Sequence, residues 1–430
     1  MNIIQITPGA GAMYCGNCFR DNALVKELRK LGHDALMVPL YLPLTLDEED
    51  QSSGIPIFYN GINVYLEQKS AWFRHAPKWV HQLFSSRKLL KMASGSAAKT
   101  RASDLGDITL SMIHGEDGNQ ARELRQLIDY FKQNTKPDII CLSNVLLAGM
   151  ARQLRSELKC PVACVLQGED TFLDALPDSH RDITWKALRE RCADIDLFIP
   201  PSQYFGELMT RRLALPTEKV QVIPDGIDLT GYQIGTPPAK PTIGYFARMC
   251  REKGLDTVVD AFIVLKKQNR VPNLQLKIGG GCGPTDQILV DALKQRLSAA
   301  GFLKDVSFHP NVTRAEKLEF MRSLTVFSVP ALYGESFGLY LLEALASGVP
   351  VIQPRHAAFP EIVEQTGGGI LCDPGSADKL AEGLASLLLD PSRARSLGRT
   401  GCETVRARYT ANAMALETLR AFQKTMDRGI

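Results

Sequence analysis

The stretch SVPALYGESFGLYLLEALASGVPVI, residues 328–352, contains one strand–helix–strand repeat. An apolar strand ends in a loop, a helix begins near Gly338, and a second apolar strand follows. A strand, a helix and a further strand in this order form a parallel βαβ unit. The stretch therefore predicts a parallel sheet with helices on its faces.

The same alternation runs through most of the 430 residues and occurs twice. A stretch rich in Gly and Pro, residues 228–241, interrupts it and is interpreted as a linker. We therefore predict an α/β protein with two doubly wound, Rossmann-like domains, 1–201 and 202–408, that face each other across a cleft. The last helix, 409–430, follows the second domain, and one possibility is that it packs back on the N-terminal domain.

Composition is that of a globular protein, with 45% apolar and 23% charged residues. The net charge of +3 is too small to indicate a nucleic-acid partner, and we predict none. Ten scattered cysteines form no compact framework and are interpreted as the reduced thiols of a cytoplasmic enzyme. The N-terminus is interpreted as a strand rather than a signal peptide, and no apolar run approaches the roughly 20 residues of a membrane-spanning helix. Any membrane contact is expected at the inner surface.

One basic segment, residues 69–103, breaks the alternation. It has eight Lys and Arg residues, no acidic residue, and interleaved Trp and Phe. The first interpretation is a helix packed on its own domain with a solvated basic side. The second is peripheral contact with anionic lipid, or with a lipid or anionic small-molecule acceptor.

Two glycine-rich stretches follow strands, PGAGAMYCG at 8–16 and KIGGGCGPT at 277–285. Neither has the third glycine of a dinucleotide-binding Gly-x-Gly-x-x-Gly loop, and Tyr14 occupies that position in the first. Gly9 and Gly11 still allow the backbone to approach an anion at the start of the following helix.

Cys15 and Cys18 have the Cys-x-x-Cys spacing of a thiol redox motif, and their role stays open. A zinc site would need a second ligand pair, which the nearby sequence lacks. We favour an interpretation in which the glycines of this loop matter and the sulfurs do not.

Two cations follow the first strand of the second half. In GYFARMCREKGLDTVVDAF, residues 244–262, Arg248 comes just after a strand and Lys253 just before a helix. Ligands of parallel sheets bind beyond the carboxyl ends of the strands, so these cations suit a diphosphate. The alternative is two solvated loop cations.

The opening stretch adds two carboxylates, Glu335 in the loop and Glu343 in the helix. The free N–H groups of Phe337, Gly338 and Leu339 would form an anion site at the start of the helix. An acid beside such a site is better suited to accept hydrogen bonds from sugar or ribose hydroxyls than to bind phosphate. The alternative is a capping charge and an ordinary surface Glu.

Together these motifs resemble the GT-B glycosyltransferases of family 4. The matching elements are RMCREKG around Arg248 and Lys253, Glu-x7-Glu at Glu335 and Glu343, PEIV at 360–363, and the following GGGILCDPGSADKLAEGL. The resemblance implies a retaining hexosyltransferase that uses a nucleoside diphosphate sugar, with uridine expected from its frequency in the family. It implies no cofactor other than this co-substrate.

The resemblance also implies roles for individual residues, with donor binding in 202–408 and the acceptor side in 1–201. Arg248 and Lys253 would hold the diphosphate, Glu335 would bind the transferred sugar, and Glu343 would bind the ribose. The first three of these are the predicted catalytic residues. The donor site would be completed by backbone groups of Gly9, Gly11, Ser336, Phe337, Gly338 and Leu339.

The chain departs from the family in VLQGEDTFL, where Gln167 stands at the position of a frequent His. Gln cannot act as a general base, and what replaces the His stays open. Glu169 and Asp170 follow, and we assign all three to the acceptor or sugar side. Asp194 and Asp196 form an Asp-x-Asp pair but lead into a strand, so we predict no metal.

Two alternatives share this fold. A nucleotide-sugar epimerase needs an acid/base pair at the sugar ring, and none can be placed. A non-enzymatic sugar-nucleotide or lipid-binding protein would not need intact Arg248, Lys253 and Glu335. The sugar, the acceptor and the oligomeric state stay open.

Overall fold

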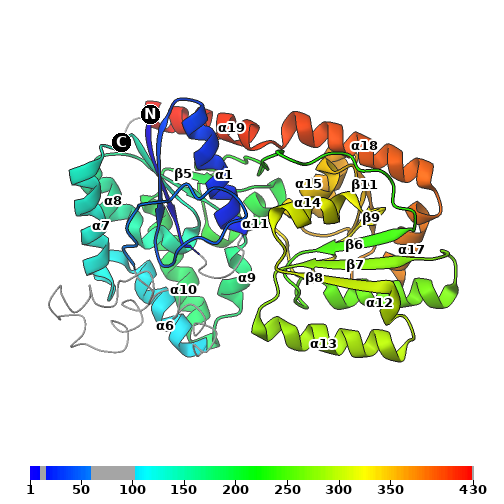
Figure 1. The fold of residues 1–430 in the computed structure, drawn as a ribbon. Coiled ribbons are helices and arrows are strands. Elements are labelled where there is room, and N and C mark those ends of the chain that lie inside the picture. The colour runs from blue at the N-terminus through cyan, green and yellow to red at the C-terminus, as the bar shows by residue number, and fades with distance from the viewer. Residues whose placement is uncertain (10–15, 60–101, 429–430) are drawn as a thin grey trace. The chain divides into compact units, whose positions relative to one another are not determined.

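The computed structural model describes residues 1–9, 16–59 and 102–428 (Figure 1). Gly11, Cys15 and the basic segment up to residue 101 lie outside the described residues. The chain divides into two compact units, Met1–Pro224 with Met414–Ile430, and Asp225–Ala413.

The unit boundary differs from the domain boundary expected after residue 201. Residues 203–213 form a helix whose Phe205, Met209 and Leu213 are buried in a core of the first unit. Met414 and Phe422, from the last helix, are buried in another core of the same unit. Burial of their apolar side chains thus places both segments in the first unit. The alternation of strands and helices along the sequence does not show this.

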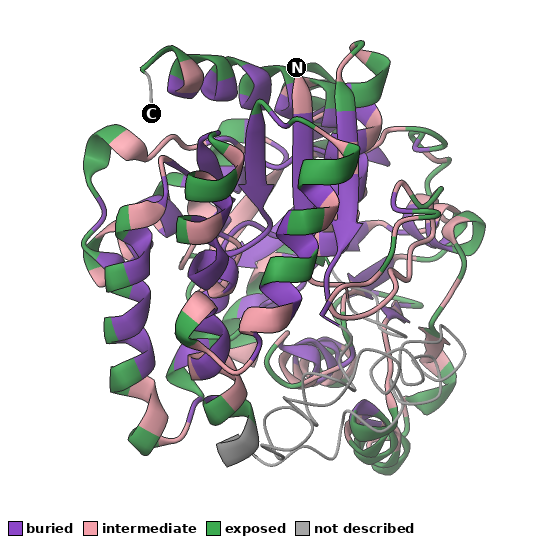
Figure 2. Ribbon diagram, turned by 90° about the vertical axis from the view of Figure 1, so that its left-hand side faces the viewer, coloured by how far each residue is buried: buried purple, intermediate pink, exposed green. Residues whose placement is uncertain are grey.

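The first unit contains a parallel sheet of five strands in the order β2-β1-β3-β4-β5. Helices cover both faces, which explains why its strands are nearly continuous apolar runs; Figure 2 shows most of this sheet as buried. The strands are β1 (Asn2–Thr7), β2 (Asp34–Pro39), β3 (Ile139–Leu142), β4 (Val162–Val165) and β5 (Leu197–Ile199).

The helices of the first unit pack on the two faces of its sheet. Leu24 and Leu28 of α1 share one core with Phe422 of α19, and the other core includes Phe131 of α7 and Leu188 of α10. The α-helices are α1 (Gly16–Lys30), α6 (Ala102–Ile113), α7 (Ala121–Asn134), α8 (Ala151–Leu158), α9 (Glu169–Asp174), α10 (Asp178–Arg191), α11 (Gln203–Leu213) and α19 (Ala411–Asp427). The 3-10 helices are η2 (Gly115–Asp117), η3 (Val145–Met150), η4 (Cys192–Asp194) and η5 (Thr217–Lys219).

The second unit contains a parallel sheet of six strands in the order β11-β10-β9-β6-β7-β8. The strands are β6 (Thr242–Phe246), β7 (Gln275–Gly280), β8 (Val306–Pro310), β9 (Val326–Phe327), β10 (Val351–Pro354) and β11 (Gly369–Cys372). The helices are α12 (Leu255–Gln268), α13 (Pro284–Ala299), η6 (Leu303–Asp305), α14 (Arg314–Arg322), α15 (Leu339–Ala346), α16 (Phe359–Thr366), α17 (Ala377–Leu388) and α18 (Pro391–Arg408). No helix in the described part of the chain is both long enough and apolar enough to cross a membrane.

Each sheet reverses its strand order once, between β1 and β3 in the first unit and between β6 and β9 in the second. Loops that leave the carboxyl ends of such neighbouring strands diverge and leave room for a ligand. The loop after β6 carries Arg248 and Lys253, and the loop after β9 carries Glu335. The topology therefore brings together residues that are more than 80 positions apart in the sequence.

Candidate functional site

Lys253 and Glu335 meet at the reversal point of the second sheet. Their Nζ and Oε2 atoms are 2.5 Å apart, and the side chains are 20% and 10% exposed. The same carboxylate oxygen accepts hydrogen bonds from the hydroxyls of Tyr340 at 2.8 Å and Tyr333 at 3.3 Å. No described residue donates to the other oxygen, Oε1, so the carboxylate is held at one atom and available at the other.

Both tyrosines also surround the ammonium group. The Nζ of Lys253 lies 4.9 Å from the ring centroid of Tyr333 and 5.4 Å from that of Tyr340, within cation–π range. Burial raises the pKa of the Tyr340 phenol, and the Glu335 carboxylate raises it further. Tyr340 therefore remains a neutral hydroxyl donor near pH 7 and keeps Glu335 in place.

Arg248 follows β6 and is paired with Asp286 in the first turn of α13. Its Nε lies 3.1 Å from each carboxylate oxygen, and its Nη2 lies 3.0 Å from Oδ1. Asp286 is 8% exposed and also accepts a hydrogen bond from the backbone N–H of Gly283 at 3.0 Å. Arg248 is 56% exposed, so a fixed carboxylate orients a largely accessible guanidinium.

Both predicted cations are held in ion pairs by carboxylates of the second unit. Arg248 and Lys253 each have a carboxylate partner within about 3 Å, so their charges are compensated within the second unit. Fixed partners keep the cations in place, at the cost of part of their attraction for an anion. The site is therefore preorganised but less positive than the sequence suggests.

Glu343 lies in α15, which begins at Leu339 close to the expected start. Its Oε1 accepts hydrogen bonds from the hydroxyl of Tyr232 at 2.8 Å and from the Nζ of Lys317 at 2.9 Å. The N-cap residue, Gly338, has a φ of 96°, which favours glycine. By the geometry of any helix start, the first N–H groups of α15 have no acceptor within the helix and can bind an anion. Ser336 and Phe337, before this start, are buried.

In the first unit, Gly9 follows β1 with a φ of 75°. A Cβ atom there would lie 1.9 Å from the carbonyl oxygen of Leu42. Glycine is therefore required for packing against the protein's own backbone, whatever else Gly9 contacts. Its predicted contact with the donor stays a prediction, as does that of Gly11.

Glu169 is buried and accepts hydrogen bonds from two backbone N–H groups. Its Oε1 accepts from Val145 at 3.0 Å and its Oε2 from Gln167 at 2.8 Å. The side-chain amide of Gln167 in turn donates to the carbonyl oxygen of Ser143 at 2.7 Å. These bonds hold the loop of Gln167, and the assignment of Glu169 to the acceptor or sugar side stays a prediction.

Asp170 is also buried, and burial raises its pKa. Its Oδ1 has no hydrogen-bond partner among the described residues. The N-cap of α9 is Gly168, so Asp170 lies in the first turn of the helix and does not cap it. Of the three residues assigned to the acceptor or sugar side, Gln167 and Asp170 each keep an acceptor oxygen, Oε1 and the buried Oδ1, with no donor among the described residues.

We predict a pH-dependent effect of Glu169→Gln. Burial raises the pKa of Glu169 to about 7, above its unfolded value of 4.5. Protonation of Glu169 in the folded state therefore contributes fully to the free energy of unfolding below about pH 4.5, and this contribution is lost as the pH rises through 7. The loss amounts to about 3 kcal/mol. Measured by urea unfolding, Glu169→Gln should destabilise the protein more at pH 5 than at pH 8. An equal effect at both values would contradict the prediction.

Sequence reasoning missed the residues that support the site. In the second unit these are Asp286, Lys317 and the three tyrosines that bond to the carboxylates. In the first unit, a buried cluster lies at the reversal point. There Thr7 Oγ1 donates to Asp21 at 2.8 Å, and Arg20 Nη1 lies 3.2 Å from the same carboxylate. Only the adjacent charges in FRDN, inside an otherwise apolar helix face, hint at this cluster.

The described residues of the Cys-x-x-Cys and Asp-x-Asp motifs are buried or bonded to neighbouring residues of the first unit. Cys18 is buried in the first turn of α1, and every described cysteine is a free thiol. Asp194 is paired with Arg152 at 3.1 Å, and Asp196 accepts a hydrogen bond from the backbone N–H of Val162 at 3.0 Å. Within residues 1–9, 16–59 and 102–428, no three His, Cys, Asp or Glu side chains are grouped to hold a metal ion.

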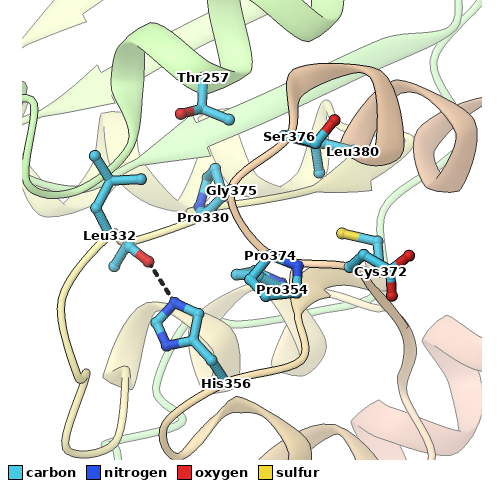
Figure 3. Close-up of a pocket in the computed structure, with 12 residues that line it drawn as sticks. Thr257, Pro330, Leu332, Pro354, His356, Cys372, Pro374, Gly375, Ser376 and Leu380 are labelled. Carbon is cyan, nitrogen blue, oxygen red and sulfur yellow. Dashed lines mark hydrogen bonds between the residues drawn. The ribbon is translucent and has the colours of Figure 1, made fainter.

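Figure 3 shows a separate pocket of about 400 Å³ in the second unit. Pro330, Pro354 and Cys372 line it from the chain at or just after β9, β10 and β11, and Ser376 lines it from the start of α17. The Nε2 of His356 donates to the carbonyl oxygen of Ala331 at 2.8 Å on its wall. None of the predicted site residues lines this pocket.

Two compact units, each built on a parallel sheet between layers of helices, are the architecture of the GT-B class of fold. The model of "Glycosyltransferase Family 4" matches residues 110–230, and that of "Glycosyl transferases group 1" matches residues 232–404. Together the two models cover more than half of the chain. The chain belongs to this glycosyltransferase family, and the expected α/β fold with two doubly wound parallel sheets is confirmed.

Solved structures with this fold align along nearly the whole chain. Sucrose-phosphate synthase from Thermosynechococcus elongatus has a TM-score of 0.71 at 19% identity, with 100% of both chains covered. Anabaena Alr3699/HepE in complex with UDP has a TM-score of 0.70 at 16% identity, covering 99% of this chain and 100% of that chain. At these identities the likeness establishes the fold alone.

Curated relatives are more similar in sequence but match over a shorter length. D-inositol 3-phosphate glycosyltransferase of Arthrobacter sp. is 32% identical over 192 residues, 42% of this chain and 45% of the relative. A GDP-mannose-dependent alpha-(1-6)-phosphatidylinositol monomannoside mannosyltransferase of Mycobacterium tuberculosis is 29% identical over 218 residues, 46% of this chain and 54% of the relative. The chain thus matches about half the length of these relatives.

Proposed function

We propose that this chain is a retaining glycosyltransferase. It moves a hexosyl group from a nucleoside diphosphate sugar, with uridine as the expected base, to an acceptor hydroxyl without a metal. The observation that carries the proposal is the cluster at the reversal point of the second sheet. There a fixed Lys–Glu pair and an oriented Arg come from the loops that bind ligands in such folds.

The described contacts support a division of roles. Arg248 and Lys253 hold the diphosphate, helped by the first N–H groups of α15. Glu335 is not bonded at Oε1 and accepts a hydroxyl of the transferred sugar there. Glu343, likewise held at one oxygen, accepts a hydroxyl of the ribose.

In the reaction, the bond between the anomeric carbon and the diphosphate oxygen breaks. The nucleoside diphosphate leaves with the bonding electrons, and the acceptor oxygen bonds to the anomeric carbon on the same face. The acceptor proton passes to the leaving phosphate, which removes the need for a base at Gln167. Lys253 and Arg248 stabilise the charge that develops on the phosphate, which is usually the largest catalytic contribution in such sites.

Names of similar proteins support a nucleotide-sugar donor but differ in the base. One relative is named as GDP-mannose-dependent, whereas structures of Alr3699/HepE contain UDP and UDP-glucose. Several relatives are named for inositol-containing acceptors, some of them lipids. We therefore keep a lipid or small anionic acceptor in the proposal. The segment 69–103 would contact it, and this segment lies outside the described residues up to residue 101.

A thermal-shift panel of UDP-, GDP- and ADP-sugars tests the proposal most simply. We expect at least one donor to raise the melting temperature by several degrees at 100 times its Kd, because binding to the folded state alone adds about 2.7 kcal/mol of stability. The uridine sugars should give the largest shift. No shift with any donor would contradict the proposed function. A larger shift with guanosine sugars would contradict only the choice of base.

A further inference from the structure

Three segments that are far apart in the sequence converge on the carboxylate of Glu343. Tyr232 comes from the 228–241 stretch, Lys317 from α14, and Glu343 itself from α15. The Tyr232 hydroxyl and the Lys317 ammonium both donate to Oε1, at 2.8 and 2.9 Å. The side chains of Lys317 and Glu343 are 10% and 17% exposed, so little water competes for these bonds.

This arrangement leaves Oε2 of Glu343 with no donor among the described residues. A carboxylate with one oxygen bonded to two donors has little freedom to rotate, and its second oxygen points in a fixed direction. Glu335 is held in the same way, with a lysine and tyrosines on Oε2 and nothing described on Oε1. The two carboxylates assigned to hydroxyl recognition thus share one supporting arrangement.

We propose that Tyr232 and Lys317 are positioning residues, which fix Glu343 so that its second oxygen accepts a ribose hydroxyl of the donor. This inference rests on the proposed function, because it takes Glu343 as the ribose ligand. Neither residue contacts the donor in this account. Both act through the carboxylate.

Tyr232 is itself firmly held. Its carbonyl oxygen accepts a hydrogen bond from Arg406 Nη2 at 2.6 Å, and the Arg314 guanidinium lies 5.8 Å from its ring centroid. The preceding Gly231 has a φ of 85°, and a Cβ there would lie 2.6 Å from Leu318 Cδ1. The part of 228–241 around Tyr232 is therefore a fixed element of the second unit rather than a free linker.

The charge of Lys317 strengthens its hold on Glu343. Its ammonium group donates a charge-assisted hydrogen bond to Oε1 at 2.9 Å, and such bonds are roughly twice as strong as neutral ones. Lys317 therefore adds more to the fixed orientation of the carboxylate than a neutral donor would.

The test compares a ribonucleotide with its 2′,3′-dideoxy analogue by titration calorimetry. The probe is whichever of UDP, GDP and ADP binds the wild-type chain most tightly. Wild-type protein should prefer the ribonucleotide by about tenfold or more, and Tyr232→Phe and Lys317→Met should each lose about tenfold in affinity for it. Affinity for the dideoxy analogue should change less than twofold, because that ligand has no hydroxyl for Glu343 to bind.

The second unit contains matched controls. Tyr409 is a similarly buried tyrosine whose hydroxyl donates to Gln365 at 2.7 Å. Lys266 is paired with Asp305 at 2.7 Å, with side chains 16% and 18% exposed. Tyr409→Phe and Lys266→Met remove comparable bonds elsewhere, and both should leave the two affinities unchanged.

Equal losses for both ligands, or no loss for either, would overturn the positioning role while leaving the proposed function intact. If none of the three nucleotides binds the wild-type chain, the proposed function fails, and the inference fails with it. A double variant gives an independent check. In a Glu343→Gln background, Tyr232→Phe should cause no further loss, and a full additional loss would overturn the inference.

Discussion

Replacing Lys253 with Met is expected to lower the turnover number by about 10²- to 10³-fold. Lys253 lies at the reversal point of the second sheet and is assigned to the charge that develops on the leaving diphosphate. Loss of one such preorganised group costs about 3 kcal/mol in comparable sites. Affinity for the free nucleoside diphosphate should fall as well. The measurement is release of nucleoside diphosphate from the donor, with water as acceptor until the acceptor is known.

The control for Lys253→Met is Lys266→Met, which breaks an ion pair of similar burial in the same unit. It should keep wild-type turnover and wild-type nucleotide affinity. If both variants lose activity equally, the effect is one of stability. If Lys253→Met keeps full turnover, Lys253 does not stabilise the leaving group.

Glu335→Gln is expected to lower turnover by about 10²-fold through a different interaction, the one with the transferred sugar. The substitution keeps the size of the side chain but removes its charge, so the pairing with Lys253 weakens and the sugar loses a charged acceptor. Because Glu335 is assigned to the sugar and not to the nucleotide, affinity for the free nucleoside diphosphate should stay within about threefold. Calorimetry with the diphosphate and kinetics with its sugar separate the two effects.

The pattern across the two variants distinguishes their roles. Lys253→Met should weaken binding of the free diphosphate, whereas Glu335→Gln should weaken only what depends on the sugar. Similar losses of diphosphate affinity in both would mean that the pair acts as a single structural unit. Glu364→Gln provides a comparison, because Glu364 is exposed and paired with Arg355, and it should change neither quantity.

Much of the fold was predictable because its strands are buried on both faces. The N-terminal run NIIQIT, which has three Ile among its six residues, forms β1 as expected, and the continuous apolar run VACV forms β4. The strand β11 is hard to predict from the sequence, because GILC is short and follows two further glycines. The boundary between the units depends on which core buries residues 202–224, and local patterns do not contain this information.

The candidate site was predictable only where its residues lie close together in the sequence. Arg248, Lys253, Glu335 and Glu343 occur in short motifs, and their spacing within one loop or one helix is visible in the sequence. Their partners come from distant elements: Asp286 from α13, with Lys317 and Tyr232 on other segments. Such tertiary pairs leave no local pattern, so the compensation of the two cations became visible only in the structure.

In the proposed reaction, Arg248 and Lys253 stabilise a departing nucleoside diphosphate. The most direct test of this role is the rate of diphosphate release at saturating donor for three proteins: the wild type, Arg248→Gln/Lys253→Gln, and Arg296→Gln/Lys266→Gln. The last is a matched control, because Arg296 and Lys266 are ion-paired with Asp260 and Asp305 in the same unit. We predict equal rates for the wild type and the control, and a rate at least about 10³-fold lower for Arg248→Gln/Lys253→Gln. Equal rates for all three proteins would contradict the account.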